Sequence, residues 1–266
     1  MSKEIISNRD YRKHSGISRS ELQLLRKSPY HFQYAQNNPD DDSESLKFGR
    51  ACHKYILEPD DFENEFAVMP KLDRRTIAGR EMYDEFVEKN AKKEIITETD
   101  YDIICEMAKA MDAVPLAKEL LKGEHEVSYF WTDPDTGIEC KCRPDCLSTY
   151  EGFGKKMLVD YKTTSSCEDG AFEKSCKKYG YQLQSGMYRE GVFQNTFDDV
   201  GFAFVAQEKS APYAVRIYVC SEEFINQGYD EFRSLIGTYK YCTETEDWFG
   251  YEGQDKCVTQ LLGEGE

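Results

Sequence analysis

Two aspartates on either side of a glycine-containing turn carry the clearest chemical signal in the sequence. Asp145 lies in Arg-Pro-Asp and Asp160 in Asp-Tyr-Lys, and both segments have the composition of β-strands. The two positions are equally far from the centre of the turn 151–154, so antiparallel pairing across it places them opposite each other, with Cβ atoms about 5 Å apart. Because two carboxylates at that distance repel each other, we expect a compensating positive charge or a metal ion nearby.

The period-two alternation of strand residues adds further polar side chains to the same face. Lys162 follows Asp160 by two positions, and a hairpin centred near Asp135 brings Glu126 opposite position 144 or 145. Three carboxylates beside a lysine suit Mg²⁺, which prefers oxygen ligands and usually keeps several waters. Such an ion lowers the pKa of a bound water and neutralises a phosphate, while the lysine could orient or deprotonate that water.

A solvated salt-bridge ladder is the alternative interpretation of these residues. If the strand 138–150 is continuous, Lys141 and Arg143 share the face of Asp145, and exposed ion pairs of this kind contribute about 0–1 kcal/mol each. The cysteines at 140, 142 and 146 then share the opposite face, which we expect to be core. Pro144 cannot donate a ladder hydrogen bond, so it indicates a bulge or a sheet edge at the site.

Two helical pairs are further candidates. Gln184 and Tyr188 are spaced i, i+4 in "YQLQSGMYREG" and face one side of a helix, where they could hold a phosphate or the surroundings of a metal. Gly49 and His53 have the same spacing in "FGRACHK", and the glycine would allow close backbone approach. A lone histidine on a helix is more often structural, so neither pair is decisive alone.

The elements that must position these side chains follow from capping and periodicity. Ser18 and Glu21 form a capping-box pattern that opens a helix with a break near Pro29. Further helices are predicted at 44–59 (closed by Pro59), 74–93, 97–121 (interrupted at Pro115), 168–195 and from 222 onward. Strands are predicted at 125–133, 138–150, 156–164, in "DVGFAFVAQE" and in "YAVRIYVCS".

The pattern predicts a single α/β (α+β) domain with a central mixed β-sheet flanked by helices. We expect a helical N-terminal part at about 1–121, a sheet-and-helix core at about 122–221, and a C-terminal helix with an acidic tail at about 222–266. The sequence shows no internal repeat and no linker long enough to divide the chain of 266 residues.

Composition restricts the compartment and the class of partner. No apolar run of eighteen residues and no N-terminal secretory stretch is present, and ten scattered cysteines without a Cys-x-x-Cys pair favour reduced thiols, so we expect a cytoplasmic protein. The net charge of −16 argues against a generic nucleic-acid coat. Basic residues are nevertheless concentrated at 71–80, 141–143, 154–156 and 174–178, so a basic cleft in an acidic exterior stays open, and the groups at 71–80 and 174–178 could hold phosphates.

The order of these pieces resembles the motif series of the PD-(D/E)XK nucleases of the RecB-like branch. His53, Glu126, Asp145 and the segments 160–162 and 184–188 follow one another as in that series. Within the branch, the stretches "GISRSELQLLRKSPYHF", "LKFGRACHKYILEPDDF" and "RRTIAGREMYDEF" are similar to RecE-type (exodeoxyribonuclease VIII-like) exonucleases of phages and prophages. The resemblance spans residues 14 to 195 and favours a nuclease over the salt-bridge ladder. It implies a core like that of restriction endonucleases.

Carried over by position, the resemblance implies a Mg²⁺ site, in which Mn²⁺ could substitute. Asp145 and Asp160 would bind the metal, His53 would be a further ligand or the partner of one, and the carbonyl of Tyr161 would complete the coordination. Lys162 would be the catalytic lysine.

The remaining motif residues receive supporting roles from the same resemblance. Glu126 would support the metal site, and Gln184 and Tyr188 would position DNA or the surroundings of the site. Iron–sulfur members of the superfamily use one upstream cysteine and a closely spaced C-terminal trio. Here no cysteine precedes Cys52, and those at 220, 242 and 257 are far apart, so we expect no iron–sulfur cluster.

The leading hypothesis is a Mg²⁺-dependent deoxyribonuclease that degrades one strand of linear double-stranded DNA from its end. By resemblance, it would supply single strands to a recombinase or single-strand annealing protein in the cytoplasm of a bacterial host, from a phage or prophage, and would form a ring, with a tetramer as the expected form. The motif separates neither exonuclease from endonuclease nor DNA from RNA. The alternatives are a catalytically inactive DNA-end-binding or anti-host phage protein on a nuclease fold and an RNA-processing nuclease.

Overall fold

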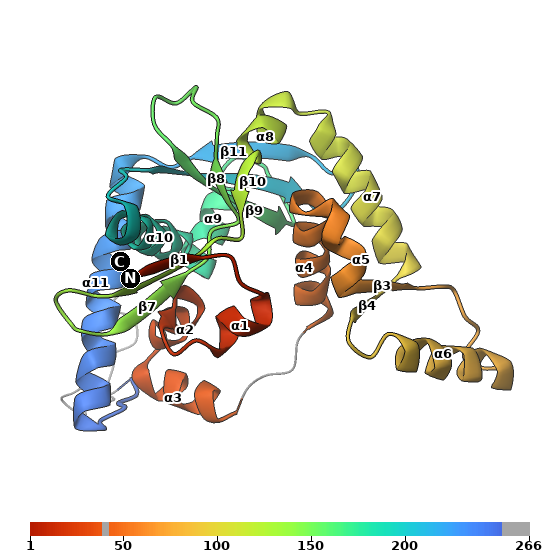
Figure 1. Ribbon diagram of the computed structural model, residues 1–266, viewed down its shortest axis with the longest axis horizontal. Coiled ribbons are helices and arrows are strands. Elements are labelled where there is room, and N and C mark those ends of the chain that lie inside the picture. The colour runs from red at the N-terminus through yellow and green to blue at the C-terminus, as the bar shows by residue number, and fades with distance from the viewer. Residues whose placement is uncertain (39–42, 252–266) are drawn as a thin grey trace, which may run out of the picture.

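The computed structural model describes residues 1–38 and 43–251 (Figure 1). Its helices are α1 (Asn8–Lys13), α2 (Arg19–Leu25), α3 (Pro29–Asn37), α4 (Glu44–Leu57), the 3₁₀ turn η1 (Pro59–Asp61), α5 (Phe62–Glu65), α6 (Ile77–Lys89), α7 (Glu98–Asp112), α8 (Pro115–Leu120), α9 (Ala171–Tyr179), α10 (Tyr181–Thr196) and α11 (Glu222–Thr245). Its strands are β1 (Ser2–Glu4), β2 (Ile17–Ser18), β3 (Phe66–Met69), β4 (Glu94–Thr97), β5 (Gly123–His125), β6 (Ser128–Thr132), β7 (Glu139–Cys142), β8 (Cys146–Ser148), β9 (Met157–Thr164), β10 (Gly201–Glu208) and β11 (Val215–Val219).

A mixed five-stranded sheet in the order β11-β10-β9-β8-β5 forms the centre of the molecule. β9 and β10 are parallel, whereas the other neighbours are antiparallel. Leu158 of β9 joins a hydrophobic cluster with residues of α2, α9, α10 and α11, and its neighbours Val159 and Tyr161 join a second cluster with α4, α7 and α8. Helices therefore cover both faces of the sheet (Figure 1), and the predicted fold class is confirmed.

The two predicted strands 125–133 and 138–150 are each broken in the middle. β6 and β7 belong to a separate four-stranded sheet in the order β1-β6-β7-β2, whereas β5 and β8 belong to the central sheet. The breaks fall at Glu126, whose φ of 53° is left-handed, and at residues 143–145 around Pro144. Since proline cannot donate a ladder hydrogen bond, the chain changes sheets there. The prediction of one continuous strand, with Lys141, Arg143 and Asp145 on a shared face, is therefore wrong.

Most predicted helix boundaries agree with the structure. Ser18 caps α2 and forms the capping box with Glu21. The helix α3 begins at Pro29, and the predicted interruption at Pro115 separates α7 from α8. The predicted helix 168–195 is divided at Gly180, whose φ of 64° ends α9 and allows the turn into α10. The N-terminal part is less helical than expected, because β1 and β2 complete the four-stranded sheet and β3 pairs with β4.

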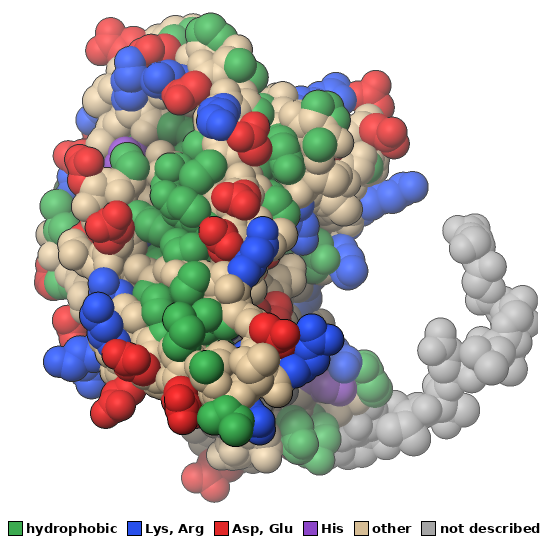
Figure 2. Space-filling model, turned by 90° about the vertical axis from the view of Figure 1, so that its right-hand side faces the viewer, with side chains coloured by type: hydrophobic (Ala, Val, Ile, Leu, Met, Phe, Trp, Pro, Cys, Tyr) green, Lys and Arg blue, Asp and Glu red, His purple; other side chains and the backbone are tan. Residues whose placement is uncertain are grey.

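The distribution of charge bears on which ligands each face can bind. On the face shown in Figure 2, acidic and basic side chains are interspersed around apolar ones, so this face carries no uniform positive field. The part of the predicted acidic tail from 252 onward, and residues 39–42 of the acidic loop, lie outside the described residues. Among the residues that the structure does describe, no helix is long and apolar enough to cross a membrane.

Candidate active site

Asp145 and Asp160 occupy the opposed positions that the turn predicts. β8 and β9 pair Cys146 with Val159, so the next pair of this register is Asp145 with Asp160. Both are buried, with 8% and 1% of their surface exposed. Burial and the charge of Asp160 raise the pKa of Asp145 well above its ordinary value. The structure therefore contains the expected repulsion between the carboxylates.

Three groups oppose this repulsion at Asp145. The charges of Lys162 and Arg143 and the backbone N–H of Tyr161 lower the pKa of Asp145. The N–H of Tyr161 donates to Asp145 Oδ2 over 2.8 Å. Because Asp145 lies just beyond the end of β8, its carboxylate accepts from the backbone of the neighbouring strand where the ladder stops. Asp145 thus binds the backbone of β9 where its pairing with β8 ends, and it also contributes negative charge to the site.

Lys162 and Gln184 hold the second carboxylate from two elements. Lys162, two positions along β9, forms an ion pair with Asp160, and the side-chain amide of Gln184 on α10 donates to the other carboxylate oxygen. Burial alone would lower the pKa of Lys162, but Asp160 and Asp145 outweigh it and raise the pKa. The lysine is therefore a cation that is paired with Asp160 and attracted by the charge of Asp145. The structure brings Gln184 into contact with Asp160, whereas the helical spacing predicted only that Gln184 shares a helix face with Tyr188.

His53 lies on α4, which packs on the other face of the central sheet from the α10 helix that carries Gln184. Its Nδ1 lies 3.2 Å from Asp145 Oδ2, and its ring packs edge-on against Tyr161 with ring centroids 5.1 Å apart. Burial, and then the charge of Lys162, lower the pKa of His53, so the imidazole is neutral, the state in which it binds metals. A Cβ atom at Gly49 would meet only Thr163 Oγ1 at 3.8 Å, so the prediction that Gly49 allows close backbone approach is wrong.

Glu126 lies at the bend of the strand between β5 and β6. Its backbone N–H donates to the carbonyl of Asp145 over 3.2 Å, which confirms the predicted pairing, and its carboxylate is 2.6 Å from Arg143 Nε. Burial and the charge of Asp145 raise the pKa of Glu126 to about 7, although Arg143 acts in the opposite direction. Glu126 is thus tied to Arg143 and can take up a proton near neutral pH.

Tyr188 lies one helical turn after Gln184, in the wall of a second cavity of about 430 Å³ that Asp145 and Glu126 also line. Burial raises the pKa of its phenol well above the ordinary value, so it is a neutral hydroxyl. The structure places Tyr188 beside the carboxylates.

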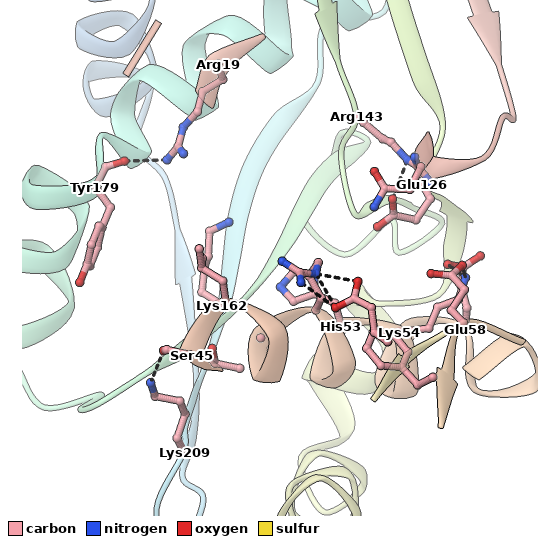
Figure 3. A pocket seen from close by; sticks show the side chains of 18 of the residues that line it. Arg19, Ser45, His53, Lys54, Glu58, Glu126, Arg143, Lys162, Tyr179 and Lys209 are labelled. Atoms are coloured by element: carbon pink, nitrogen blue, oxygen red, sulfur yellow. Dashed lines mark hydrogen bonds and ion pairs between the residues drawn. The ribbon is translucent and has the colours of Figure 1, made fainter. Parts of the chain in front are cut away.

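A cleft of about 520 Å³ opens onto the site and contains residues that the sequence analysis did not find (Figure 3). Lys162, His53 and Glu126 line it together with Arg19 of α2, Tyr179 of α9 and Lys209 after β10. Arg19 and Tyr179 are 160 positions apart in the chain, so only the fold brings them together. The one sequence signal was "KKYGYQ", in which two lysines precede two tyrosines that a glycine separates.

The donor set fits a hard divalent cation. Mg²⁺ is commonly bound by one or two carboxylates, with waters and substrate phosphates as its other ligands. Asp145 and Asp160 supply two facing carboxylates, and the neutral His53 and the Tyr161 backbone lie beside them. Within the described ranges, no three His, Cys, Asp or Glu side chains are grouped closely enough to form a complete metal site. A cation bound by these residues would therefore take its remaining ligands from water and substrate.

Comparison with known proteins identifies the family of the chain. The family whose profile matches residues 18–260 is described as a PDDEXK-like domain of unknown function (DUF3799). The chain belongs to this family. Since PDDEXK nucleases generally use divalent metals, the paired carboxylates have the expected chemistry. No curated protein matches the chain.

Solved structures add information on the fold. A crystal structure titled "Putative exonuclease", from Eubacterium rectale, is 15% identical, has a TM-score of 0.65, and the match covers 99% of this chain and 96% of that one. At this identity the similarity shows a common fold. A second structure, SSO0001, is 12% identical over 90% of this chain and 97% of that one, with a TM-score of 0.29, and carries no argument.

Proposed function

We propose that the protein is a Mg²⁺-dependent deoxyribonuclease that degrades one strand of linear double-stranded DNA from its end. The observation that carries the proposal is the buried pair Asp145 and Asp160, opposed across two strands and held by Lys162. Buried like charges are costly, and Asp145 lines a cavity together with Glu126 and Tyr188, which supports a functional site. The family membership and the exonuclease-titled structural neighbour support a nuclease.

The chemistry divides among the residues as follows. A bound divalent metal would neutralise charge on the scissile phosphate and lower the pKa of a water. Asp145 and Asp160 would hold the metal, with the neutral imidazole of His53 and the carbonyl of Tyr161 as further donors. Lys162, which pairs with Asp160 in this structure, would then face the phosphate and orient the attacking water.

Three residues would keep this arrangement in place. The amide of Gln184 fixes the orientation of the Asp160 carboxylate. Glu126, with a pKa near neutrality, could accept a proton from the site while Arg143 keeps its side chain in position. Tyr188 would position the surroundings of the carboxylates from the adjoining cavity.

The test is cleavage of end-labelled linear duplex DNA and of a covalently closed circle, with Mg²⁺, with Mn²⁺ and with EDTA. We expect metal-dependent release of short products from the linear duplex and none from the circle. Lys162→Ala should be inactive, and Lys118→Ala, which removes an exposed lysine on α8, should match wild type. Efficient cutting of the circle would contradict the exonuclease, preference for RNA would contradict the substrate, and tight binding of DNA ends without cleavage would favour a non-catalytic protein.

The assembly and partners extend this proposal. A ring-forming homo-oligomer, with a tetramer as the expected form, would enclose duplex DNA and remain on it between cuts. Its product would pass to a single-strand annealing protein in a bacterial cell that carries the gene on a phage or prophage. Light scattering at assay concentrations tests the ring, and a protein that stays monomeric would remove it.

A further inference from the structure

An exposed aromatic side chain lies in the wall of the cleft. Tyr179 is the last residue of α9, lines the same cleft as Lys162, and has 47% of its surface exposed. Its carbonyl accepts a hydrogen bond from Arg19 over 2.7 Å, and the carbonyl of Lys177 accepts one from Arg26 over 3.0 Å (Figure 3 shows the first). Two arginines of the N-terminal part thus anchor the end of α9, while the ring remains accessible.

The exposed surface around this ring is positively charged. Lys174, Lys177 and Lys178 are all exposed on α9, and Lys178 Nζ lies 5.0 Å from the centroid of the Tyr179 ring. None of these three lysines forms an ion pair with a carboxylate in the part of the chain that the structure describes. In a protein with a net charge of −16, these unneutralised lysines form a local positive surface, which is what binding of a phosphate requires.

Two other cations that line the cleft, Lys54 and Arg143, are neutralised by carboxylates. Lys54 contacts three carboxylates, those of Glu58, Asp61 and Glu65, at 2.7–2.9 Å, and Arg143 is paired with Glu126. The lysines of α9 therefore differ from these cleft residues in being available to an anionic ligand.

A second aromatic ring connects Tyr179 to the catalytic lysine. The ring of Tyr181 stacks on that of Tyr179 with centroids 5.9 Å apart and an interplanar angle of 30°. Lys162 Nζ lies 5.1 Å, and the Arg19 guanidinium carbon 5.8 Å, from the Tyr181 centroid. The two stacked rings thus lead from the exposed surface of α9 to the group that would face the scissile phosphate.

We propose that Tyr179 stacks on an unpaired base of the DNA strand being cut, while Lys177 and Lys178 contact the neighbouring phosphates. The inference rests on the proposed function and specifies its substrate as a strand whose terminal nucleotides are separated from the duplex. Stacking requires a free base face, which paired and stacked duplex bases do not offer. Every base has such a face, so the site accepts any sequence, as a degrading enzyme requires.

The test is a thermodynamic cycle in which the ring of Tyr179 and the DNA base are removed singly and together. The probe is a fluorescent duplex with a three-nucleotide single-stranded overhang, of either polarity, measured by anisotropy with Ca²⁺ in place of Mg²⁺ so that binding is observed without cleavage. A set of overhangs carries an abasic nucleotide at each position in turn. The variants are Tyr179→Ala, Tyr179→Phe and, as the matched control, Tyr34→Ala on α3, whose side chain is 61% exposed.

We expect Tyr179→Ala to bind the intact overhang roughly 5- to 100-fold more weakly, as for the loss of one base–aromatic stack. Tyr179→Phe and Tyr34→Ala should bind as wild type. At one overhang position, the abasic nucleotide should lower the affinity of wild type for the DNA by a similar factor. At the same position it should not lower the affinity of Tyr179→Ala any further. The inference is wrong if Tyr179→Ala binds the intact overhang as tightly as wild type does. It is also wrong if Tyr179→Ala loses the same affinity on the intact overhang and on every abasic overhang.

Cleavage of the same duplex by wild type with Mg²⁺ separates the two proposals. If wild type degrades the duplex but ring and base show no coupling, the stacking inference fails alone. If wild type neither binds nor cleaves the DNA, the proposed nuclease function fails and the stacking inference with it. Circular dichroism of Tyr179→Ala controls for folding, which we expect to be unchanged because the side chain is exposed.

Discussion

The two opposed aspartates should have different effects on the stability of the metal-free protein. Asp160 has a direct cationic partner in Lys162, whereas Asp145 mainly adds negative charge beside it. Asp145→Asn removes the repulsion and leaves the ion pair of Asp160 intact. Asp160→Asn also removes the repulsion, but it takes away the partner of a largely buried ammonium. We therefore expect Asp145→Asn to stabilise the protein in EDTA and Asp160→Asn to destabilise it.

The magnitudes follow from Coulomb's law and from the cost of unpaired charges. Two unit charges about 5 Å apart repel by about 3 kcal/mol at an effective dielectric constant of about 20. The attraction of Asp145 to Lys162 offsets most of this, so the net gain from Asp145→Asn is about 1 kcal/mol, or a rise in Tm of about 2–4 °C for a chain of this length. Breaking a buried pair costs about 3–5 kcal/mol. Since the charge of Asp145 remains near Lys162 and partly replaces that of Asp160, we expect a loss of about 2 kcal/mol, or about 4–8 °C.

Thermal melts of wild type and both variants, in EDTA and with Mg²⁺, measure these differences. Wild type should gain RT ln(1 + [Mg²⁺]/Kd), about 2.7 kcal/mol at a hundredfold excess over Kd, and both variants should lose most of this gain. Neither variant should cleave DNA. If both variants melt lower than wild type in EDTA by similar amounts, and Mg²⁺ shifts none of the three proteins, the carboxylates are a structural ladder and the reasoning is refuted.

Three further predictions concern separate parts of the molecule. Lys162→Ala should lower the single-turnover cleavage rate by at least about 100-fold, as for loss of a proton-transfer or water-orienting group, while anisotropy in Ca²⁺ still detects DNA binding. The double variant of Lys177→Gln and Lys178→Gln should reduce the slope of log K against log salt concentration by about 1–2, measured by anisotropy titrations. Arg233→Met should lower Tm at pH 7 by breaking the contact with the buried Asp133, whose pKa burial would raise but Arg233 holds below its ordinary value. Because this contribution exists above the unfolded-state pKa of Asp133 and is lost as pH falls through the folded one, the Tm difference should narrow in acid.

The pairing register of the site could be predicted because it depends on local geometry. The centre of a hairpin loop fixes which residues face each other across two antiparallel strands, so the position of the turn 151–154 inside the loop 149–156 was sufficient to align Asp145 with Asp160. The spacing i, i+4 placed Gln184 and Tyr188 on one helix face in the same way. These predictions required no knowledge of how distant segments pack.

The bend in the hairpin could not be predicted, because distant segments cause it. The alternation of residues continues in the same register on both sides of residues 143–145, so the sequence resembles one long strand. The separation into two sheets depends on β1 and β2, which pair with β6 and β7 from the N-terminus of the chain. Pro144 indicated the place of the break, but the identity of the second sheet follows only from this long-range pairing.

The sequence alone also could not show which basic segments remain without a neutralising carboxylate in the folded protein. Composition made 71–80 and 174–178 equivalent candidates for phosphate contacts. In the structure, Arg75 pairs with Asp73 and the Arg74 guanidinium lies over the ring of Tyr83 at 3.9 Å, whereas the lysines of α9 have no carboxylate partner among the described residues. Net local charge depends on which acids the fold brings near, and for this reason the proposed phosphate contacts lie on α9.

Asp145 accepts a backbone hydrogen bond and is also a proposed metal ligand, so the choice of substitution decides which of the two effects is measured. Its Oδ2 accepts the N–H of Tyr161 where the ladder ends, and the same oxygen lies 3.2 Å from Nδ1 of His53. An alanine would remove the charge and also leave a buried backbone N–H without its partner, which costs about 1–3 kcal/mol. An asparagine retains an oxygen that can accept this hydrogen bond while it removes the charge. The difference in Tm between Asp145→Ala and Asp145→Asn therefore measures the structural contribution, and the effect of Asp145→Asn on Mg²⁺ stabilisation measures the role in metal binding.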